Sequence, residues 1–156
     1  MKYRCVIDTN VVLDWLVFDD PGAQWLRDTS REGCEILTHT TLIEELSRVL
    51  AYPDLKLTGD RRAELLQRYA ERTVQSEMPE AFSRDCLLLP AGFPHCADRD
   101  DDVFLAVVYH ARADALVTKD KALLKLRKRA ARYGVRILTV GEASTMLVQA
   151  RNRENA

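Results

Sequence analysis

Four aspartates lie within five residues, at positions 98–102, directly before a long apolar stretch. Aspartates at the start of a helix ordinarily accept hydrogen bonds from free N–H groups and favour the positive end of the helix dipole. That role accounts for one or two of them. Four carboxylates so close together raise one another's pKa unless a cation neutralises them. A divalent metal ion held by oxygen ligands is such a cation, so this cluster is a candidate metal site.

Other acids are expected to join the cluster. Asp8 and Asp120 each follow a short apolar stretch that is typical of a buried strand. The carboxyl ends of parallel strands share one edge of a sheet, and ligands bind at that edge. Glu45 lies one turn into a predicted helix at residues 42–50, next to its buried stripe. We therefore expect acids from four separate segments, with Asp102 opening the helix of the cluster, to meet at one edge.

The elements that must position these acids alternate along the whole chain. Strands are predicted at residues 3–7, 34–37, 73–78, 115–118 and 135–140. Helices are predicted at residues 42–50, 61–73, 102–110, 121–132 and 141–150. This alternation predicts an α/β fold, a three-layer sandwich with a mostly parallel central sheet flanked by helices. A single domain is expected over residues 1–150, with residues 151–156 as a frayed tail.

Composition limits the kinds of partner. The chain has 156 residues, and its formal net charge of -1 predicts no general attraction to nucleic acid, so such binding must come from local patches. The four cysteines are scattered without a metal-binding spacing, which predicts reduced thiols. No apolar run reaches the roughly 18 residues of a membrane span, and no basic-then-apolar leader opens the chain. We therefore expect a cytoplasmic protein with no membrane partner.

Basic residues crowd the segment after Asp120. Cations spaced three or four residues apart share one face of the predicted helix at 121–132. We expect these cations, together with Lys121 at the start of that helix, to bind the phosphates of a nucleic-acid strand that enters the metal site. The alternative is that they only form a solvated helix face. Polar residues beside two strand ends complete the predicted substrate-binding set. The full set is Thr9, Asn10, Thr118, Lys121, Lys125, Lys128, Arg129 and Arg132.

Four blocks of the sequence, in their order and spacing, resemble the PIN domain family. They are Val6-Ile7-Asp8-Thr9-Asn10-Val11, Leu42-Ile43-Glu44-Glu45-Leu46-Ser47-Arg48-Val49-Leu50, Asp98-Arg99-Asp100-Asp101-Asp102-Val103-Phe104-Leu105-Ala106 and Leu116-Val117-Thr118-Lys119-Asp120-Lys121. The branch it resembles most is that of the toxins of bacterial toxin–antitoxin pairs. The resemblance implies a ribonuclease that depends on Mg²⁺ or Mn²⁺, an RNA substrate, a cognate antitoxin as partner, and a homodimer.

Carried over by position, the resemblance assigns catalysis to four acids: Asp8, Glu45, Asp102 and Asp120. It assigns metal binding to Asp8, Asp102 and Asp120, together with Asp98 and Asp101. The acidic block of this branch usually reads Asp-Pro-x-Asp-Asp, and Arg99 stands here in place of the proline. The division of roles among Asp98, Asp101 and Asp102 therefore stays open.

Other functions fit parts of the sequence less well than a nuclease does. A calcium-binding EF-hand loop begun at Asp98 would need Gly at Val103 and Glu at Tyr109, so that reading is excluded. A metal-dependent phosphohydrolase and a PIN-like module that binds nucleic acid or a partner without catalysis both remain as alternatives. Because all four acid positions are filled, we expect the nuclease.

Overall fold

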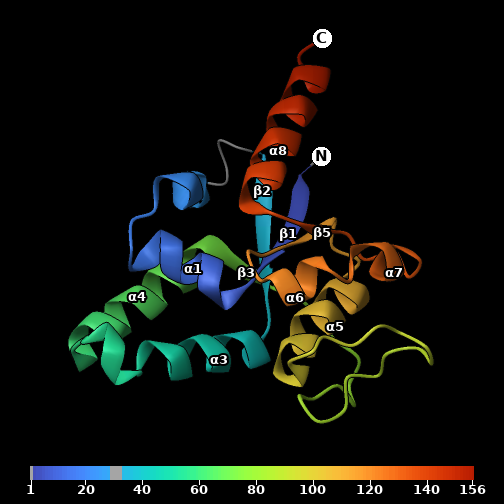
Figure 1. The fold of residues 1–156 in the computed structure, drawn as a ribbon. Coiled ribbons are helices and arrows are strands. Elements are labelled where there is room, and N and C mark those ends of the chain that lie inside the picture. Colours follow the sequence, from blue (N-terminus) through green and yellow to red (C-terminus); the bar gives the residue numbers. More distant parts are fainter. Residues whose placement is uncertain (1, 29–32) are drawn as a thin grey trace.

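The computed structural model describes residues 2–28 and 33–156 and is built on one five-stranded sheet (Figure 1). All its strand pairs are parallel, in the order β3-β2-β1-β4-β5. The strands are β1 (Tyr3–Ile7), β2 (Cys34–Thr38), β3 (Thr73–Gln75), β4 (Ala115–Val117) and β5 (Ile137–Leu138). Every predicted strand is therefore present, although β3 and β5 are shorter than expected. β1 is central, so the residue that follows it lies in the middle of the rim formed by the carboxyl ends.

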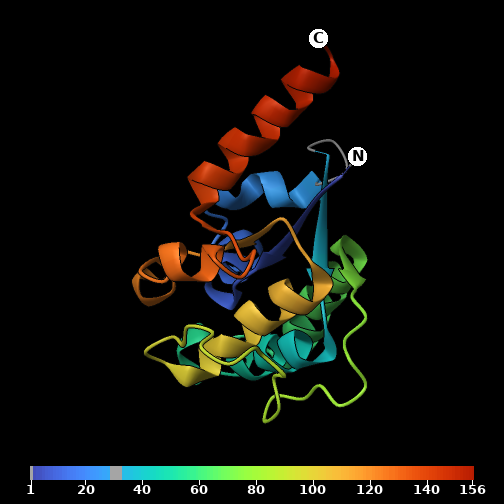
Figure 2. The same cartoon turned by 90° about the vertical axis from the view of Figure 1, so that its right-hand side faces the viewer.

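Helices cover both faces of the sheet (Figures 1 and 2). They are α1 (Thr9–Leu16), η1 (Pro21–Asp28), α3 (Thr40–Leu50), η2 (Pro53–Leu55), α4 (Gly59–Arg72), η3 (Arg99–Asp101), α5 (Asp102–Ala111), α6 (Lys121–Leu124), α7 (Arg127–Ala131) and α8 (Val140–Glu154). One core cluster joins the sheet to α1, η1, α4, α8 and most of α3, and a second joins its other face to α5, α6 and α7. The three-layer α/β fold is confirmed.

The alternation of side chains along β1 shows why the sheet needs both layers. Cys5 and Ile7 belong to the first core cluster, whereas Val6 belongs to the second. Successive residues of a strand point to opposite faces, so an apolar run is stable only when both faces are covered. Burial of one such aliphatic side chain contributes about 1.5–3 kcal/mol, which fixes the sheet between the two helical layers.

Two details differ from the sequence-based expectation. The predicted helix at 121–132 is wrong as one helix, because α6 and α7 are separated at Lys125 and Leu126. There the N–H of Leu126 donates to the carbonyl oxygen of Leu123 at 3.0 Å, which tightens the turn and keeps both leucines buried. At the other end of the chain, α8 continues through Glu154, past the predicted boundary at residue 150.

A long connection, residues 76–98, runs beside α5 and has little regular structure. It is held by contacts to that helix: His110 Nε2 lies 2.8 Å from the carbonyl oxygen of Leu87, and Phe93 packs edge-on against Tyr109. The connection therefore brings its last residues to the start of α5, where the acidic cluster lies. Within the described ranges, no helix combines the length and hydrophobicity that a membrane crossing requires.

Candidate metal centre

Asp8 and Thr118 are neighbours because of the register between β1 and β4. Ile7 pairs with Val117, so the residues that follow these two strands lie side by side at the carboxyl rim. The hydroxyl of Thr118 donates to Asp8 Oδ2 at 2.6 Å and accepts the N–H of Asp120 at 3.0 Å. Thr118 is fully buried. Its position therefore favours a role in orienting the two acids over contact with substrate.

Asp8 and Asp120 both stand at the start of a helix. Asp120 caps α6, since its Oδ1 accepts the N–H of Ala122 at 2.8 Å. Asp8 precedes α1 and is 4% exposed. Burial raises the pKa of Asp8, the hydrogen bond from Thr118 opposes that rise, and the charge of Asp120 adds to it. The two carboxyl groups therefore interact directly at the rim.

Asp101 joins them from a third segment, the short turn η3 before α5. Burial, repulsion from Asp8, a hydrogen bond with Asp120 and repulsion from Asp98 together raise the pKa of Asp101 to about 7. Interactions of this kind act over a few ångströms, so the structure brings three acids together. Asp98 is more exposed, and its Oδ1 accepts the N–H of Asp100 at 3.0 Å, which caps the turn.

Asp102 points elsewhere, although it is the next residue after Asp101. Its Oδ1 accepts the N–H of Cys96 at 2.7 Å, and its Oδ2 lies 2.9 Å from Nδ1 of His95. Every residue of α5 from Asp102 to Val108 is buried, so a carboxylate at the start of this helix faces the interior. Asp101 is therefore the acid whose pKa responds to Asp8 and Asp120, whereas Asp102 is held by His95 and Cys96.

The sequence contains a signal for this difference. The apolar run that follows Asp102 has no polar stripe, which is typical of a helix buried on all sides. A carboxylate at the first residue of such a helix needs internal donors. Those donors, from His95 and Cys96, were not anticipated as partners of Asp102.

Glu45 lies in a neighbouring cavity. Its carboxylate pairs with Arg48 at 2.7 Å and lies 3.7 Å from Arg84, and its side chain is 14% exposed. The guanidinium of Arg84 also donates to the carbonyl oxygen of Thr41 at 3.0 Å. This cavity of about 310 Å³ is lined by Glu44, Glu45, Arg48, Arg84 and Asp100. Glu45 is therefore neutralised by guanidinium groups and stands next to the residue that precedes Asp101.

The residues at the rim fit a hard divalent cation. The donors of Asp8, Asp101 and Asp120 are all carboxylate oxygens, which are the ligands that Mg²⁺ and Mn²⁺ prefer. Within the part of the chain that the structure describes, no three Asp, Glu, His or Cys side chains already surround one ligand point. Burial and the interactions with Asp8 and Asp120 favour the protonated form of Asp101, whereas a bound cation would favour its carboxylate form.

The metal-free protein should lose stability as the pH rises through about 7, because Asp101 must then ionise among other carboxylates. Its pKa is about 7 in the folded chain and near the ordinary 3.8 when unfolded, so its favourable contribution is complete below pH 3.8 and lost above 7. The full shift corresponds to about 4 kcal/mol, which partial exposure and solvent screening reduce to about 1–2 kcal/mol.

Asp101→Asn, which cannot ionise, should therefore be more stable than the wild type at pH 8 by about 1–2 kcal/mol and by much less at pH 5. Urea unfolding in chelator at both pH values measures this difference. Asp100→Asn, which removes a neighbouring charge outside the three-acid cluster, serves as the control. An equal effect of Asp101→Asn at both pH values would contradict the assigned pKa.

A parallel α/β domain with carboxylates at its strand ends is suited to binding a divalent cation at that edge. Residues 4–122 match the family model described as the PIN domain, and that match covers more than half of the chain. The chain belongs to the PIN domain family, as its sequence blocks predicted. Proteins of this family are generally nucleases that need a divalent metal. The comparisons with curated proteins and with solved structures gave no match.

Proposed function

We propose that this protein is an endoribonuclease that depends on Mg²⁺ or Mn²⁺ and is the toxin of a toxin–antitoxin pair in the cytoplasm. One observation carries the proposal: Asp8, Asp101 and Asp120 come from three segments and meet at the carboxyl rim. Carboxylates crowded in this way are costly without a cation, and phosphodiester hydrolysis is chemistry that such a cation serves. An antitoxin partner and a homodimer are parts of the same proposal.

Each rim residue has a distinct task in this mechanism. Asp8, Asp101 and Asp120 would hold the cation, and Thr118 keeps two of them in place through its hydrogen bonds. A bound divalent cation would make a water molecule more acidic and neutralise charge on the phosphate. Asp102 would act indirectly, since its bonds to Cys96 and His95 fix the start of α5 and hence the backbone that carries Asp101.

The cations of α6 and α7 would receive the RNA. Their exposed side chains follow Asp120 directly, so phosphates bound there lie close to the rim. These exposed cations are Lys121, Lys125, Lys128, Arg129 and Arg132. α1 also begins at the rim. In its first turn Asn10 is exposed and available to substrate, whereas Thr9 is buried.

The test is cleavage of labelled single-stranded RNA and of DNA of the same sequence, with Mg²⁺, with Mn²⁺ and in chelator. We expect RNA to be cut internally only when metal is present, and the DNA to be cut much more slowly. Induced expression should stop growth of the host, and Asp101→Asn should abolish that effect. The proposal would be contradicted if the protein bound RNA but cut it neither with Mg²⁺ nor with Mn²⁺.

That outcome would instead support the alternative of a PIN-fold module that binds without catalysis. One observation favours this alternative. Glu45 is ion-paired with Arg48, and Asp102 faces the interior, so two of the four acids expected in catalysis have other partners. A small phosphomonoester in the same assay distinguishes a general phosphohydrolase, which would hydrolyse it, from a nuclease, which would not.

A further inference from the structure

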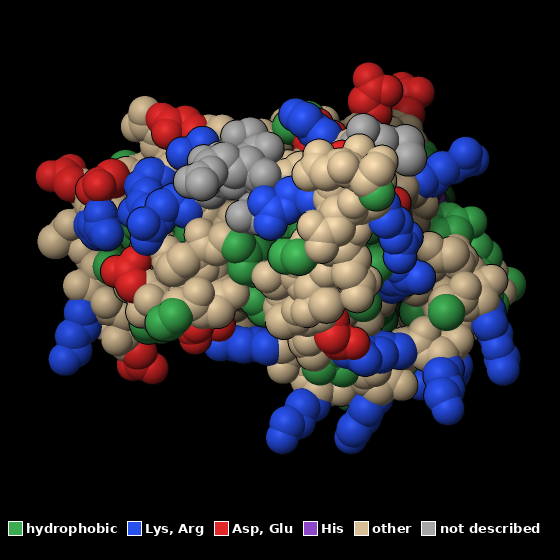
Figure 3. All heavy atoms as spheres, turned by 90° about the horizontal axis from the view of Figure 1, so that it is seen from above, with side chains coloured by type: hydrophobic (Ala, Val, Ile, Leu, Met, Phe, Trp, Pro, Cys, Tyr) green, Lys and Arg blue, Asp and Glu red, His purple; other side chains and the backbone are tan. Residues whose placement is uncertain are grey.

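The amino ends of the strands form a second concave surface, opposite the acidic rim. Three cavities of about 570, 430 and 350 Å³ adjoin there. Tyr3 and Asp114 line both the first and the second cavity, Ala113 and Gly134 both the first and the third, and Arg112 both the second and the third. We call this surface the amino-end face, and Figure 3 looks onto this end of the molecule.

The amino-end face is strongly basic, although the whole chain has a net charge of -1. Its cavities are lined by seven lysines or arginines and by only two acids. Figure 3 shows Lys and Arg side chains at many places on this end of the molecule, with some acids among them. The basic residues are Lys2, Arg4, Arg112, Arg127, Arg136, Arg151 and Arg153, and the acids are Asp114 and Glu154. Positive charge is therefore concentrated at the end opposite to the acidic rim.

Several of these cations lack an acidic partner. Arg4 lies 3.7 Å from Glu35, and Arg127 pairs with Glu142. By contrast, four of the lining cations form no ion pair with a carboxylate within residues 2–28 and 33–156. They are Lys2, Arg112, Arg136 and Arg153. Cations that a protein leaves uncompensated at one surface are available to an anionic partner.

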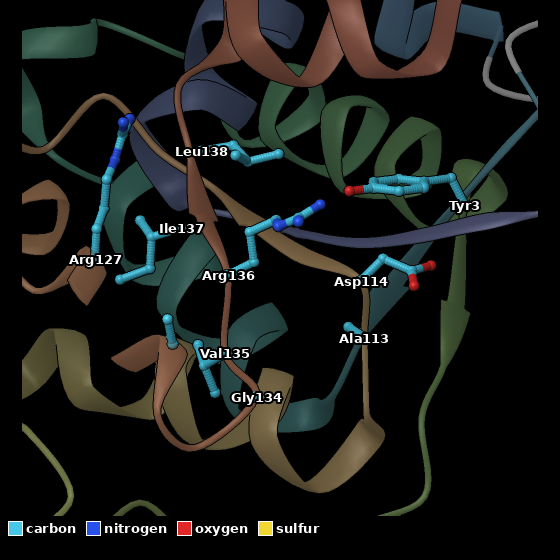
Figure 4. A pocket seen from close by; sticks show the side chains of 10 residues that line it. Tyr3, Ala113, Asp114, Arg127, Gly134, Val135, Arg136, Ile137 and Leu138 are labelled. Carbon is cyan, nitrogen blue, oxygen red and sulfur yellow. The ribbon is translucent and has the colours of Figure 1, made fainter. Parts of the chain in front are cut away.

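Arg136 is the best placed of them. Its guanidinium donates to the sulfur of Met146 at 3.8 Å, and the hydroxyl of Tyr3 donates to the same sulfur at 3.6 Å. Arg136 also opposes the rise in the pKa of Tyr3 that burial causes. Figure 4 shows this guanidinium at the centre of the largest cavity, extended toward Tyr3, with Arg127 on the other side. An arginine whose guanidinium contacts a thioether instead of a carboxylate keeps most of its N–H donors for a ligand.

The amino-end face is continuous with the cations proposed to receive RNA at the rim. Arg127 and Ala131 of α7 line its largest cavity, and the same helix carries Lys128 and Arg129. α6, which precedes α7, begins directly after Asp120. Exposed cations of α6 and α7 therefore lie between the acidic rim and the amino-end face.

We propose that the amino-end face is a second RNA-binding site, which holds a part of a long or folded RNA remote from the bond that is cut. This inference rests on the proposed ribonuclease function. A polyanion with regularly spaced phosphates matches unpaired cations spread over three adjoining cavities. A short RNA that fills only the rim would not reach this face, so the site would select RNA by length and fold.

The test replaces three of the unpaired cations in one variant, Arg112→Gln, Arg136→Gln and Arg153→Gln. Binding is measured in chelator across a salt series, with a single-stranded RNA of about six nucleotides and a hairpin of about thirty. Affinity for the hairpin should fall about tenfold or more, and its salt slope should fall by about 2–3, because each lost phosphate contact contributes roughly 0.7–0.9. Binding and metal-dependent cleavage of the short RNA should not change.

A charge-matched control carries Arg62→Gln, Arg68→Gln and Arg72→Gln on α4, which lies on another part of the molecule (Figure 1). Unchanged hairpin affinity in the first variant, or an equal loss in the control, would overturn the proposal. The proposal would also be overturned if the first variant bound the hairpin normally but no longer bound an acidic protein partner, because the face would then serve a protein instead of RNA. A wild type that cuts neither RNA would refute the proposed catalysis, while the binding comparison in chelator would still decide the second site.

Discussion

Asp101→Asn is expected to lower the turnover of RNA by about a thousandfold or more, whereas Asp100→Asn should keep turnover within a few-fold of the wild type. Asp101 is the acid that interacts with both Asp8 and Asp120, and an amide in its place removes one negative charge and one ligand. A thousandfold loss corresponds to about 4 kcal/mol of transition-state stabilisation. Asp100 lines the neighbouring cavity with Arg48 and lies outside the three-acid cluster.

Single-turnover cleavage at saturating RNA and saturating Mg²⁺ measures this effect separately from substrate affinity. Calorimetric titration with Mn²⁺ gives a second readout, since Asp101→Asn should also weaken metal binding. Equal activity of the Asp101→Asn variant and the wild type would exclude Asp101 as a ligand. A loss found only in Asp102→Asn would return the role to Asp102, where the family resemblance placed it.

Asp102→Ala is expected to destabilise the fold by about 2–4 kcal/mol. The change leaves the N–H of Cys96 buried without an acceptor and removes the partner of His95. A buried donor without a partner costs about 1–3 kcal/mol, and the cavity left by the side chain adds to that cost. Asp102→Asn should cost much less, because its amide oxygen can still accept the N–H of Cys96.

Urea unfolding of the three proteins in chelator checks the prediction at pH 7. His95→Ala provides the matched control, since the His95 side chain is half exposed and its loss should cost less than 1 kcal/mol. Asp102→Ala with the stability of the wild type would show that the hydrogen bond from Cys96 contributes little. Together with the Asp101→Asn experiment, this comparison distinguishes the structural role of Asp102 from the proposed metal-binding role of Asp101.

The sequence by itself determined the layers of the fold and part of the site. The apolar runs ending at Ile7 and Val117 predicted two strands of a mostly parallel sheet, and in the structure these strands pair with each other in parallel. The acids expected near their ends, Asp8 and Asp120, lie close enough for the charge of Asp120 to raise the pKa of Asp8. These inferences succeed because a strand carries its periodicity and its end in a few consecutive residues. The spacing of the four acidic blocks also indicated the PIN family, which the family model confirms.

Only the tertiary structure decided which acids of the cluster face the rim. Consecutive residues at a helix start differ in direction by about 100°, so Asp101 and Asp102 cannot serve the same site equally. The difference depends on distant partners: Asp8 and Asp120 raise the pKa of Asp101, whereas His95 and Cys96 contact the carboxyl group of Asp102. A single sequence does not reveal such contacts, because they form only when α5 packs on the sheet.

The pairing of Glu45 and the basic amino-end face were decided in the same way. Arg84 reaches Glu45 from a long irregular connection that follows three intervening elements, η2, α4 and β3. The cations of the amino-end face come from both ends of the chain, from the end of α5, from α7 and from the residue before β5. No local stretch of sequence shows their proximity. Local patterns fix where helices and strands begin and end, whereas the charges that share a surface follow from how the layers pack.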